Sequence, residues 1–398
     1  MSKLKLVFLD GLTYLATIIT VLGLGVIFFY VMREGSSLIS LDLLRGDYHA
    51  SVFVARPTSD DIYSGSLEGF DDEALIVVER YGLVLEESRN LAGDRVIRVH
   101  YISEDSPLWH LENQDRTSNE SIVGLRPGVI LQRVSYVDHP TSLTSRGALL
   151  MGQDLNDSER EIREVIFAFE GGGIRGSIIT TLYLIGLTLL IAIPFGVLSA
   201  IYFNEFAPNN KITRTMRRFI ETLTGVPSII YGLLGITVFV PLTVRLTPAS
   251  NANLIAGALT LSVILLPIII RTTEEALMVV PQDHRLASLA LGANKTQTTF
   301  KVVLKQALPG ILTATFLGIG RVIGESAALI FVLGTAIKDQ VRIFEPSTSL
   351  AVHIWSLMTD EPANIALSSS IALIILAIVL ILNVSVKVTV LFFNRKGV

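Results

Sequence analysis

The chain has 398 residues, of which 50% are hydrophobic and only 17% are charged, and its formal net charge is −4. This composition and several long apolar runs place it among polytopic membrane proteins. The absence of cysteine excludes disulfide bonds and cysteine-ligated metal sites.

The charge is unevenly distributed along the chain. Residues 34–175 contain 13 arginines, no lysine and 25 of the 36 acidic residues, so this part has a net charge of −12. The remainder has 19 basic and 11 acidic residues and a net charge of +8. The asymmetry indicates that an acidic, water-soluble domain is inserted into a membrane protein with basic flanks.

The first apolar run, Leu12–Met32, has 21 residues without a charge, which is long enough for one transmembrane helix. A cleaved signal peptide is the alternative, but the run lacks the small-residue cleavage site of such peptides. Lys3 and Lys5 precede it and favour a cytoplasmic N-terminus. Residues 1–33 are therefore expected to form a retained transmembrane helix.

The acidic part, residues 34–175, has the sequence pattern of a small folded domain. Strand-like runs occupy 51–57, 95–103 and 128–138, and the run 71–87 is ambiguous between strand and helix. Ser158 and Glu161 form a plausible capping box that predicts a helix through Phe169, and three glycines then form a hinge. We expect a mixed α/β domain.

Five more apolar runs follow the acidic part. They are residues 178–203, 219–240, 254–270, 308–335 and 365–393. Together with the first run they predict six transmembrane helices, five of them within a transmembrane domain at 176–398. Lysine and arginine concentrate in the short loops after the second, fourth and sixth helices, which predicts cytoplasmic N- and C-termini. The predicted fold class is an all-α polytopic membrane protein with an inserted extracytoplasmic mixed α/β domain.

The polar segment 271–308 has too regular a pattern of apolar residues for an unstructured linker. Apolar residues recur along it, and Gly292 separates two helix-like pieces. Both neighbouring runs are long enough to span a bilayer, so the segment must lie on one side, and the charge bias places it in the cytoplasm. A patterned loop of this kind is expected to bind a partner.

Two charged residues lie within the fifth apolar run. Arg321 and Glu325 are one helical turn apart and are expected to share one face. Each costs about 2.5–3.5 kcal/mol at the middle of a membrane, so such residues usually face a cavity or each other. They form either a structural ion pair or part of an anion path in which the guanidinium binds an oxyanion. For Glu221 and Arg271, near the cytoplasmic ends of their helices, snorkelling is the alternative to a function.

Two further features have competing interpretations. Residues 225–228 and Tyr231-Gly232 interrupt the third run, where freed backbone groups face a cavity or small residues allow close helix packing. Trp355 lies beside His353 between the fifth and sixth runs and is expected in the headgroup belt of the membrane.

No motif of an enzyme is recognisable in the chain. It contains neither a phosphate-binding glycine loop ending in Gly-Lys-Ser/Thr nor a His-Glu-x-x-His sequence, and its six histidines do not cluster. We expect a protein that is not itself catalytic, has no cofactor or metal, and does not bind nucleic acid.

The loop after the fourth run resembles the membrane permeases of bacterial ABC importers. Those permeases carry Glu-Ala-Ala, three residues, Gly, nine residues and Ile-x-Leu-Pro in a cytoplasmic loop. Here Leu286-Ala287-Ser288, Gly292 and Val302-x-Leu304 occupy the matching positions. Leu286 and Lys305 replace the expected Glu and Pro.

Within that family, the chain is most similar to the phosphate-specific permeases. The segments that carry this resemblance are 171–174 (GGGI), 181–184 (TLYL), 193–208 (IPFGVLSAIYFNEFAP), 220–235 (IETLTGVPSIIYGLLG), 271–277 (RTTEEAL), 289–304 (LALGANKTQTTFKVVL) and 318–327 (GIGRVIGESA).

The resemblance implies an ATP-driven importer of inorganic phosphate in the bacterial inner membrane, surrounded by lipid. A second permease would complete the pore, a cytoplasmic ATPase dimer would bind the loop, and an extracytoplasmic phosphate-binding protein would deliver the substrate. The resemblance assigns Arg321, Glu325 and Arg271 to the substrate pathway. It assigns Leu286, Ala287, Ser288, Gly292, Val302 and Leu304 to ATPase coupling.

Two alternatives remain open from the sequence. The same permease plan serves importers of other oxyanions, such as molybdate or sulfate. A protein with an extracytoplasmic domain between membrane helices can also be an envelope sensor or scaffold.

Overall fold

The computed structural model describes residues 3–58, 61–67, 69–70, 72, 74–89, 95–114, 121–169, 171–359 and 363–395. It divides into two compact units. The first, here called the helical unit, comprises residues 1–45 and 174–398, and the second, the inserted domain, comprises residues 46–173.

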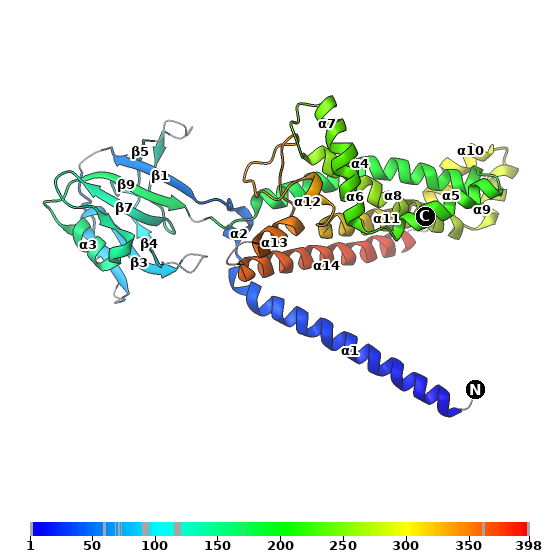
Figure 1. The fold of residues 1–398 in the computed structure, drawn as a ribbon, viewed down its shortest axis with the longest axis horizontal. Coiled ribbons are helices and arrows are strands. Elements are labelled where there is room, and N and C mark those ends of the chain that lie inside the picture. Colours follow the sequence, from blue (N-terminus) through cyan, green and yellow to red (C-terminus); the bar gives the residue numbers. More distant parts are fainter. Residues whose placement is uncertain are drawn as a thin grey trace. The chain divides into compact units, whose positions relative to one another are not determined.

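The inserted domain is built on an antiparallel sheet of nine strands among its described residues (Figure 1). The strands are β1 (Ser51–Pro57), β2 (Leu75–Val78), β3 (Leu83–Arg89), β4 (Arg95–Ile102), β5 (Leu111–Asn113), β6 (Ile122–Val123), β7 (Ile130–Tyr136), β8 (Ser142–Leu143) and β9 (Ile162–Phe169). Their order is β2-β3-β4-β7-β9-β1-β5-β6, with β8 paired to β7. The three strands predicted from the sequence coincide with β1, β4 and β7.

Apolar residues of the central strands form the core of this domain. Leu83, Leu85, Ile97, Leu131 and Phe167 are fully buried in it. Helix α3 (Ala148–Asn156) adds the side chains of Met151 and Leu155 to the same core. The ambiguous run 71–87 forms β2 and β3, although its residues 71 and 73 lie outside the described part.

The helix predicted from Ser158 through Phe169 is wrong, because Ile162–Phe169 is strand β9. This strand pairs with β1 on one side and with β7 on the other, so its backbone hydrogen bonds lie within the sheet. Asp157 rather than Ser158 accepts a backbone hydrogen bond here, from the N–H of Glu159. Tertiary pairing overrides the local capping pattern, as it often does for short apolar runs.

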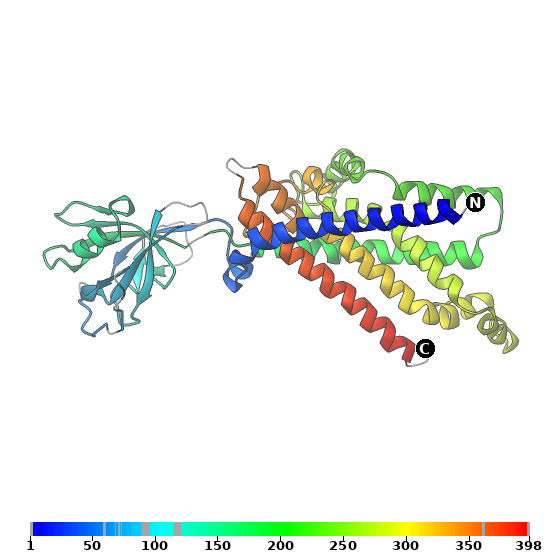
Figure 2. The same cartoon turned by 90° about the horizontal axis from the view of Figure 1, so that it is seen from below.

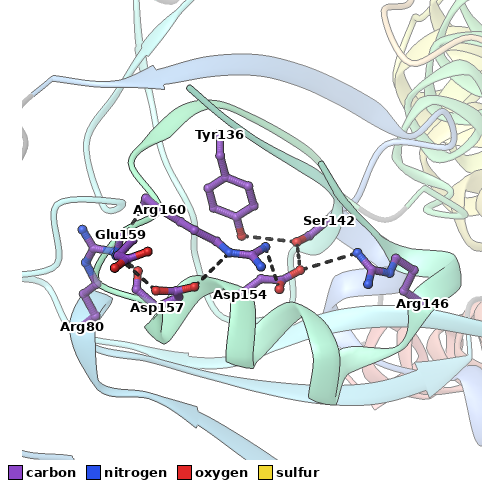
Figure 3. Close-up of polar contacts among 8 residues, drawn as sticks. All are labelled: Arg80, Tyr136, Ser142, Arg146, Asp154, Asp157, Glu159 and Arg160. Atoms are coloured by element: carbon purple, nitrogen blue, oxygen red, sulfur yellow. Dashed lines mark hydrogen bonds and ion pairs between the residues drawn. The ribbon is translucent and has the colours of Figure 1, made fainter. Parts of the chain in front are cut away.

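A polar cluster joins α3 to the sheet (Figure 3). Asp154 of α3 accepts a hydrogen bond from Ser142 of β8 and forms an ion pair with Arg160, at 2.7 Å from a guanidinium nitrogen. Ser142 Oγ lies 3.3 Å from the Tyr136 hydroxyl oxygen at the end of β7. Arg80 donates hydrogen bonds to the carbonyl oxygens of Asp157 and Arg160. The cluster therefore fixes both the helix and the segment after it.

Tyr136 should make the stability of the inserted domain depend on alkaline pH. Burial raises the pKa of Tyr136 to about 12, above the value of about 10 for an unfolded chain. Its contribution to the free energy of unfolding is therefore present below pH ~10 and lost as the pH rises through ~12, with an upper limit of about 3 kcal/mol. The chain has two tryptophans, so the change Trp355→Phe leaves Trp109 of the inserted domain as the fluorescent probe. In this full-length variant, the urea concentration at the midpoint of unfolding should fall between pH 9 and pH 11.5.

The change Tyr136→Phe should reduce this fall in the urea midpoint. The matched control is Tyr101→Phe, because the Tyr101 side chain is 39% exposed. An identical pH dependence with Tyr136 and with Phe at this position would contradict the assignment.

The helical unit contains six helices in its described residues that are long and apolar enough to cross a membrane. They are Asp10–Leu38, Arg175–Phe206, Ser228–Leu246, Leu254–Val279, Lys295–Gly324 and Ile365–Val388. The prediction of six transmembrane helices is confirmed by length and composition.

Some of these spans contain more than one helical element. The helices are α1 (Lys3–Gly35), α2 (Leu41–Arg45), α4 (Arg175–Ile201), α5 (Lys211–Thr224), α6 (Ser228–Leu234), α7 (Val240–Leu246), α8 (Leu254–Val279), α9 (Gln282–Ala290), α10 (Lys295–Thr298), α11 (Leu304–Gly324), α12 (Leu329–Val332), α13 (Leu350–Thr359) and α14 (Ile365–Arg395). Short π-helical turns cover Tyr202–Phe206, Gly235–Phe239 and Thr299–Val303.

Helix α8 lies at the centre of the unit. It packs against α4 and α11, and its residues Leu254, Ala258, Leu261 and Leu265 belong to a buried apolar cluster. Figure 2 shows α1 and α14 approaching each other at one end, where Ser370 Oγ donates a hydrogen bond to the Gly35 carbonyl oxygen at 2.7 Å.

Two predicted spans have different bounds in the structure. The predicted interruption of the third run at 225–228 is confirmed, because α5 ends at Thr224 and α6 begins at Ser228, but the span then continues to Leu246 rather than ending at residue 240. The fifth span begins at Lys295 and ends at Gly324 rather than covering 308–335. Hydropathy misses its amphipathic first turns, and Glu325 takes an extended backbone conformation that ends α11.

Candidate functional site

The segment that links α8 to α10 is a helical elbow, here defined as residues 280–294. Helix α9 ends at Ala290, and Gly292, two residues later, has a φ of +86°. The N–H of Gly292 bonds to the Leu289 carbonyl and that of Ala293 bonds to the Ser288 carbonyl, the pattern of a Schellman motif. A glycine stands at the left-handed position because other L-residues are strained there.

The next helix begins with equally clear local chemistry. Asn294 Oδ1 accepts from the N–H of Gln297, and Gln297 Oε1 accepts from the N–H of Asn294. This capping box starts a continuous helical span from Lys295 to Gly324. The two motifs fix the orientation of α9 relative to the span Lys295–Gly324, so the elbow has a defined structure rather than that of an irregular loop.

A groove of about 830 Å³ lies along the elbow. Its lining comprises Asp283, His284, Ala287, Ser288, Leu291, Gly292, Ala293, Gln297, Lys301 and Val302. Leu286 and Leu291 lie at the surface, with 59% and 90% of their area exposed. A mixed apolar and polar groove with exposed leucines fits a protein partner better than a small ion.

The structure brings together four of the six residues that the family resemblance assigns to ATPase coupling. Ala287, Ser288, Gly292 and Val302 line the groove. Leu286 is exposed outside its lining, and Leu304 packs against an apolar cluster at the base of the helices. The segment predicted as loop 271–308 is helical at both ends, because α8 continues to Val279 and the next span starts at Lys295.

Two arginines brace this end of the helical unit, and sequence reasoning missed their roles. Arg285 of α9 donates to Glu205 at 2.8 Å and to the carbonyl oxygens of Val280 and Leu277. Arg217 of α5 donates to the Phe203 carbonyl oxygen at 2.6 Å and pairs with Glu274 of α8 at 3.1 Å. Their acidic partners, Glu205 and Glu274, are distant in sequence, so no local spacing could have revealed these ion pairs.

Arg321 and Glu325 lie together near the other end of α11. Their nitrogen and oxygen atoms are 3.6 Å apart, longer than a normal hydrogen bond. The Arg321 side chain is 47% exposed, whereas that of Glu325 is 6% exposed. Glu325 Oε1 also accepts from the N–H of Ala328, which helps to start α12. The guanidinium is therefore partly available to a second ligand.

Arg271 is separate from this pair. It lies in α8, where it bonds to Glu275 at 3.2 Å and is 60% exposed. Leu265 of α8 lies beside Gly318 of α11, so Arg271 and Arg321 differ by about 13 Å in height along the helices. Arg271 instead lines a small cavity of about 50 Å³ with Arg217, Glu221 and Glu274.

The interruption of the third run has two parts. Between Gly225 and Pro227 the helix breaks, and the Tyr231 hydroxyl donates to the carbonyl of Leu223 at the end of α5. Gly232 packs against α12, because a Cβ there would lie 2.8 Å from the Ala328 backbone. At Gly232 the close-packing interpretation therefore holds.

Residues 192–396 match the family model described as "Binding-protein-dependent transport system inner membrane component". The chain is 37% identical over 232 residues to the probable ABC transporter permease protein YqgI of Bacillus subtilis, covering 54% of this chain and 77% of that protein.

Two further relatives carry phosphate transport in their names. The phosphate transport system permease protein PstA of Haemophilus influenzae is 33% identical over 234 residues, covering 57% of this chain and 78% of that protein. The PstA homolog of Mycoplasma genitalium is 34% identical over 236 residues, covering 58% of this chain and 36% of that protein. The chain belongs to the family of binding-protein-dependent transport system inner membrane components.

Proposed function

We propose that the chain is a pore-forming permease subunit of an ATP-driven importer of inorganic phosphate. The observation that carries the substrate is the half-exposed guanidinium of Arg321 at the end of a membrane-spanning helix. The names of the Haemophilus influenzae and Mycoplasma genitalium relatives support the same substrate.

The chemistry of Arg321 suits a tetrahedral oxyanion. A guanidinium offers parallel N–H groups that match two oxygens of phosphate, and it stays charged at all physiological pH values. Glu325 orients Arg321 without satisfying it, because their separation of 3.6 Å leaves hydrogen-bonding capacity free. A cation that is held in place but still has free N–H donors can bind the anion and also release it, as transport requires.

Arg321 faces away from the packed centre of its own helical unit. Val322 and Ile323 beside it are 1% and 2% exposed, whereas the Arg321 side chain is 47% exposed. In an importer this surface would line the pore shared with a second permease. Arg271, at a different height, would serve the path nearer the elbow.

The elbow gives the second part of the proposal. Its groove would receive a cytoplasmic ATPase, one copy for each permease, so that ATP binding and hydrolysis move the helices. The elbow end and both termini would be cytoplasmic. The inserted domain would be extracytoplasmic, on the side from which a phosphate-binding protein delivers substrate.

Uptake of radiolabelled phosphate tests the substrate. In a strain that lacks this chain, phosphate uptake at low external concentration should fall and should return when the chain is restored. Uptake of molybdate and of sulfate should stay unchanged. Loss of molybdate or sulfate uptake with normal phosphate uptake would assign the permease to another oxyanion and contradict the proposal.

A further inference from the structure

The π-helical turn Tyr202–Phe206 at the end of α4 is contacted from several directions. Such turns interrupt the regular hydrogen-bond ladder and often mark functional positions. Glu205 on this turn has only 10% of its side chain exposed and accepts hydrogen bonds from Arg285 at 2.8 Å and from Asn204 at 2.9 Å. A carboxylate this buried is stable only when it is paired.

Residues on both sides of Gly292 contact this turn. Arg285 comes from α9, before Gly292, and its side chain is 17% exposed. Lys295 comes from α10, after Gly292, and its ammonium nitrogen lies 5.3 Å from the centre of the Phe206 ring. The residues before and after Gly292 therefore contact consecutive residues of the π-helical turn that follows α4.

The same arginine also binds the end of α8. Its guanidinium donates to the carbonyl oxygens of Val280 at 2.6 Å and Leu277 at 2.9 Å. Carbonyl groups at a helix C-terminus have no hydrogen-bond donors within the helix, so Arg285 provides the donors for these carbonyls of α8. One side chain thus connects α9 to the ends of two membrane-spanning helices.

An apolar cluster packs the same region where the elbow meets the helix ends. Ile201 of α4, Phe203 of the π-helical turn, Leu277 of α8, and Val303 and Ala307 of the fifth span belong to one buried cluster. Arg217 adds a hydrogen bond to the carbonyl oxygen of Phe203. A movement of the elbow is therefore expected to move these helix ends with it, because the contacts between them are made by packed side chains rather than by a loose loop.

We propose that Glu205 and Arg285 are positioning residues that link the elbow rigidly to α4 and α8, so that these parts move as one body during transport. This inference rests on the proposed function, because it assigns to the pair the transmission of motion from the ATPase groove to the pore helices. Neither Glu205 nor Arg285 is among the residues that line the groove, so the effect of the pair is expected on coupling rather than on ATPase binding.

The first test measures anions transported per ATP hydrolysed by the complete complex in proteoliposomes. Glu205→Gln keeps the size of the side chain but removes the charge that holds Arg285. Transport per ATP should fall at least about tenfold, the effect of losing one charge-assisted hydrogen bond. ATP hydrolysis should remain within about twofold, since the groove is unchanged.

The matched control is Glu345→Gln. Glu345 also pairs with an arginine at 3.1 Å, but its side chain is 42% exposed and that of Arg342 is 68% exposed. Its transport per ATP should stay at the wild-type value. If Glu205→Gln merely lowers assembly, so that transport and hydrolysis fall by the same factor, the pair is structural and the inference is overturned.

A second measurement does not depend on which anion is carried. The chain contains no cysteine, so spin labels can be attached at Leu198→Cys on α4 and Ala290→Cys on α9. In the assembled complex, the distance between the labels should be the same with and without bound ATP. In the Glu205→Gln background the distance distribution should broaden or change with ATP.

The two measurements separate the two proposals. A label distance that changes with ATP in the presence of Glu205 would overturn the rigid link, even if phosphate is transported. A constant distance in a complex that transports only another oxyanion would support the link and overturn the phosphate assignment.

Discussion

Replacement of Arg321 by glutamine is expected to abolish phosphate uptake while the chain still assembles with its partners. Glutamine cannot offer the charged, bidentate N–H groups, and each such hydrogen bond contributes about 1.5–3 kcal/mol. Uptake should therefore fall at least about 100-fold, since about 1.4 kcal/mol corresponds to tenfold. Initial rates of radiolabelled phosphate uptake, normalised to assembled complex, measure this effect.

The structural alternative for Arg321 predicts a different pattern. If the residue only neutralises Glu325, whose side chain is 6% exposed, the single variant should misassemble because it leaves a buried charge unpaired. The double variant Arg321→Gln with Glu325→Gln removes both charges and should then recover assembly and uptake. We expect the double variant to assemble and to remain inactive. Recovery of uptake would contradict an anion-binding role.

Arg321→Lys separates charge from shape. It keeps a positive charge in the last turn of α11, which is favourable at a helix C-terminus. It loses the planar fork that matches two phosphate oxygens. We expect intermediate uptake, with weaker apparent affinity for phosphate. Full activity of the lysine variant would show that charge alone suffices.

Replacement of Gly292 by valine is expected to uncouple ATP hydrolysis from transport. The φ of +86° at this position is one that a β-branched residue adopts only under strain, at a cost of about 1–2 kcal/mol or more. The chain can relieve that strain by unwinding the Schellman motif, which changes the direction of α9 and the shape of the groove. Transport per ATP should fall about tenfold.

Controls for Gly292 separate backbone strain from added bulk. No atom lies within 4 Å of the Cβ position at Gly292, so a steric clash is not the cause. Gly186 of α4 has equally open surroundings and an ordinary helical backbone, so Gly186→Val should leave coupling unchanged. Gly292→Asn should also be mild, because asparagine tolerates the left-handed conformation. Normal transport by Gly292→Val would contradict a coupling role for the elbow.

Much of the architecture follows from local sequence. Six apolar runs predict six spans because hydropathy depends only on neighbouring residues. Gly292 and Asn294 mark the elbow because their turn and capping chemistry is complete within a few residues. The alternation of apolar and polar residues in β1, β4 and β7 is local in the same sense.

The rest depends on pairing between distant parts of the chain. Residues 162–169 form a strand only because β1 and β7 provide hydrogen-bond partners on both sides, against a local helix signal. The contact of Arg285 with Glu205 spans 80 positions, and no periodic pattern reaches so far. Arg321 and Glu325 were found from their spacing, but only the packing around them decided that one is buried and the other half-exposed. Local propensities thus determined the elements and their turns, whereas burial and long-range pairing decided which charges are satisfied and which remain available.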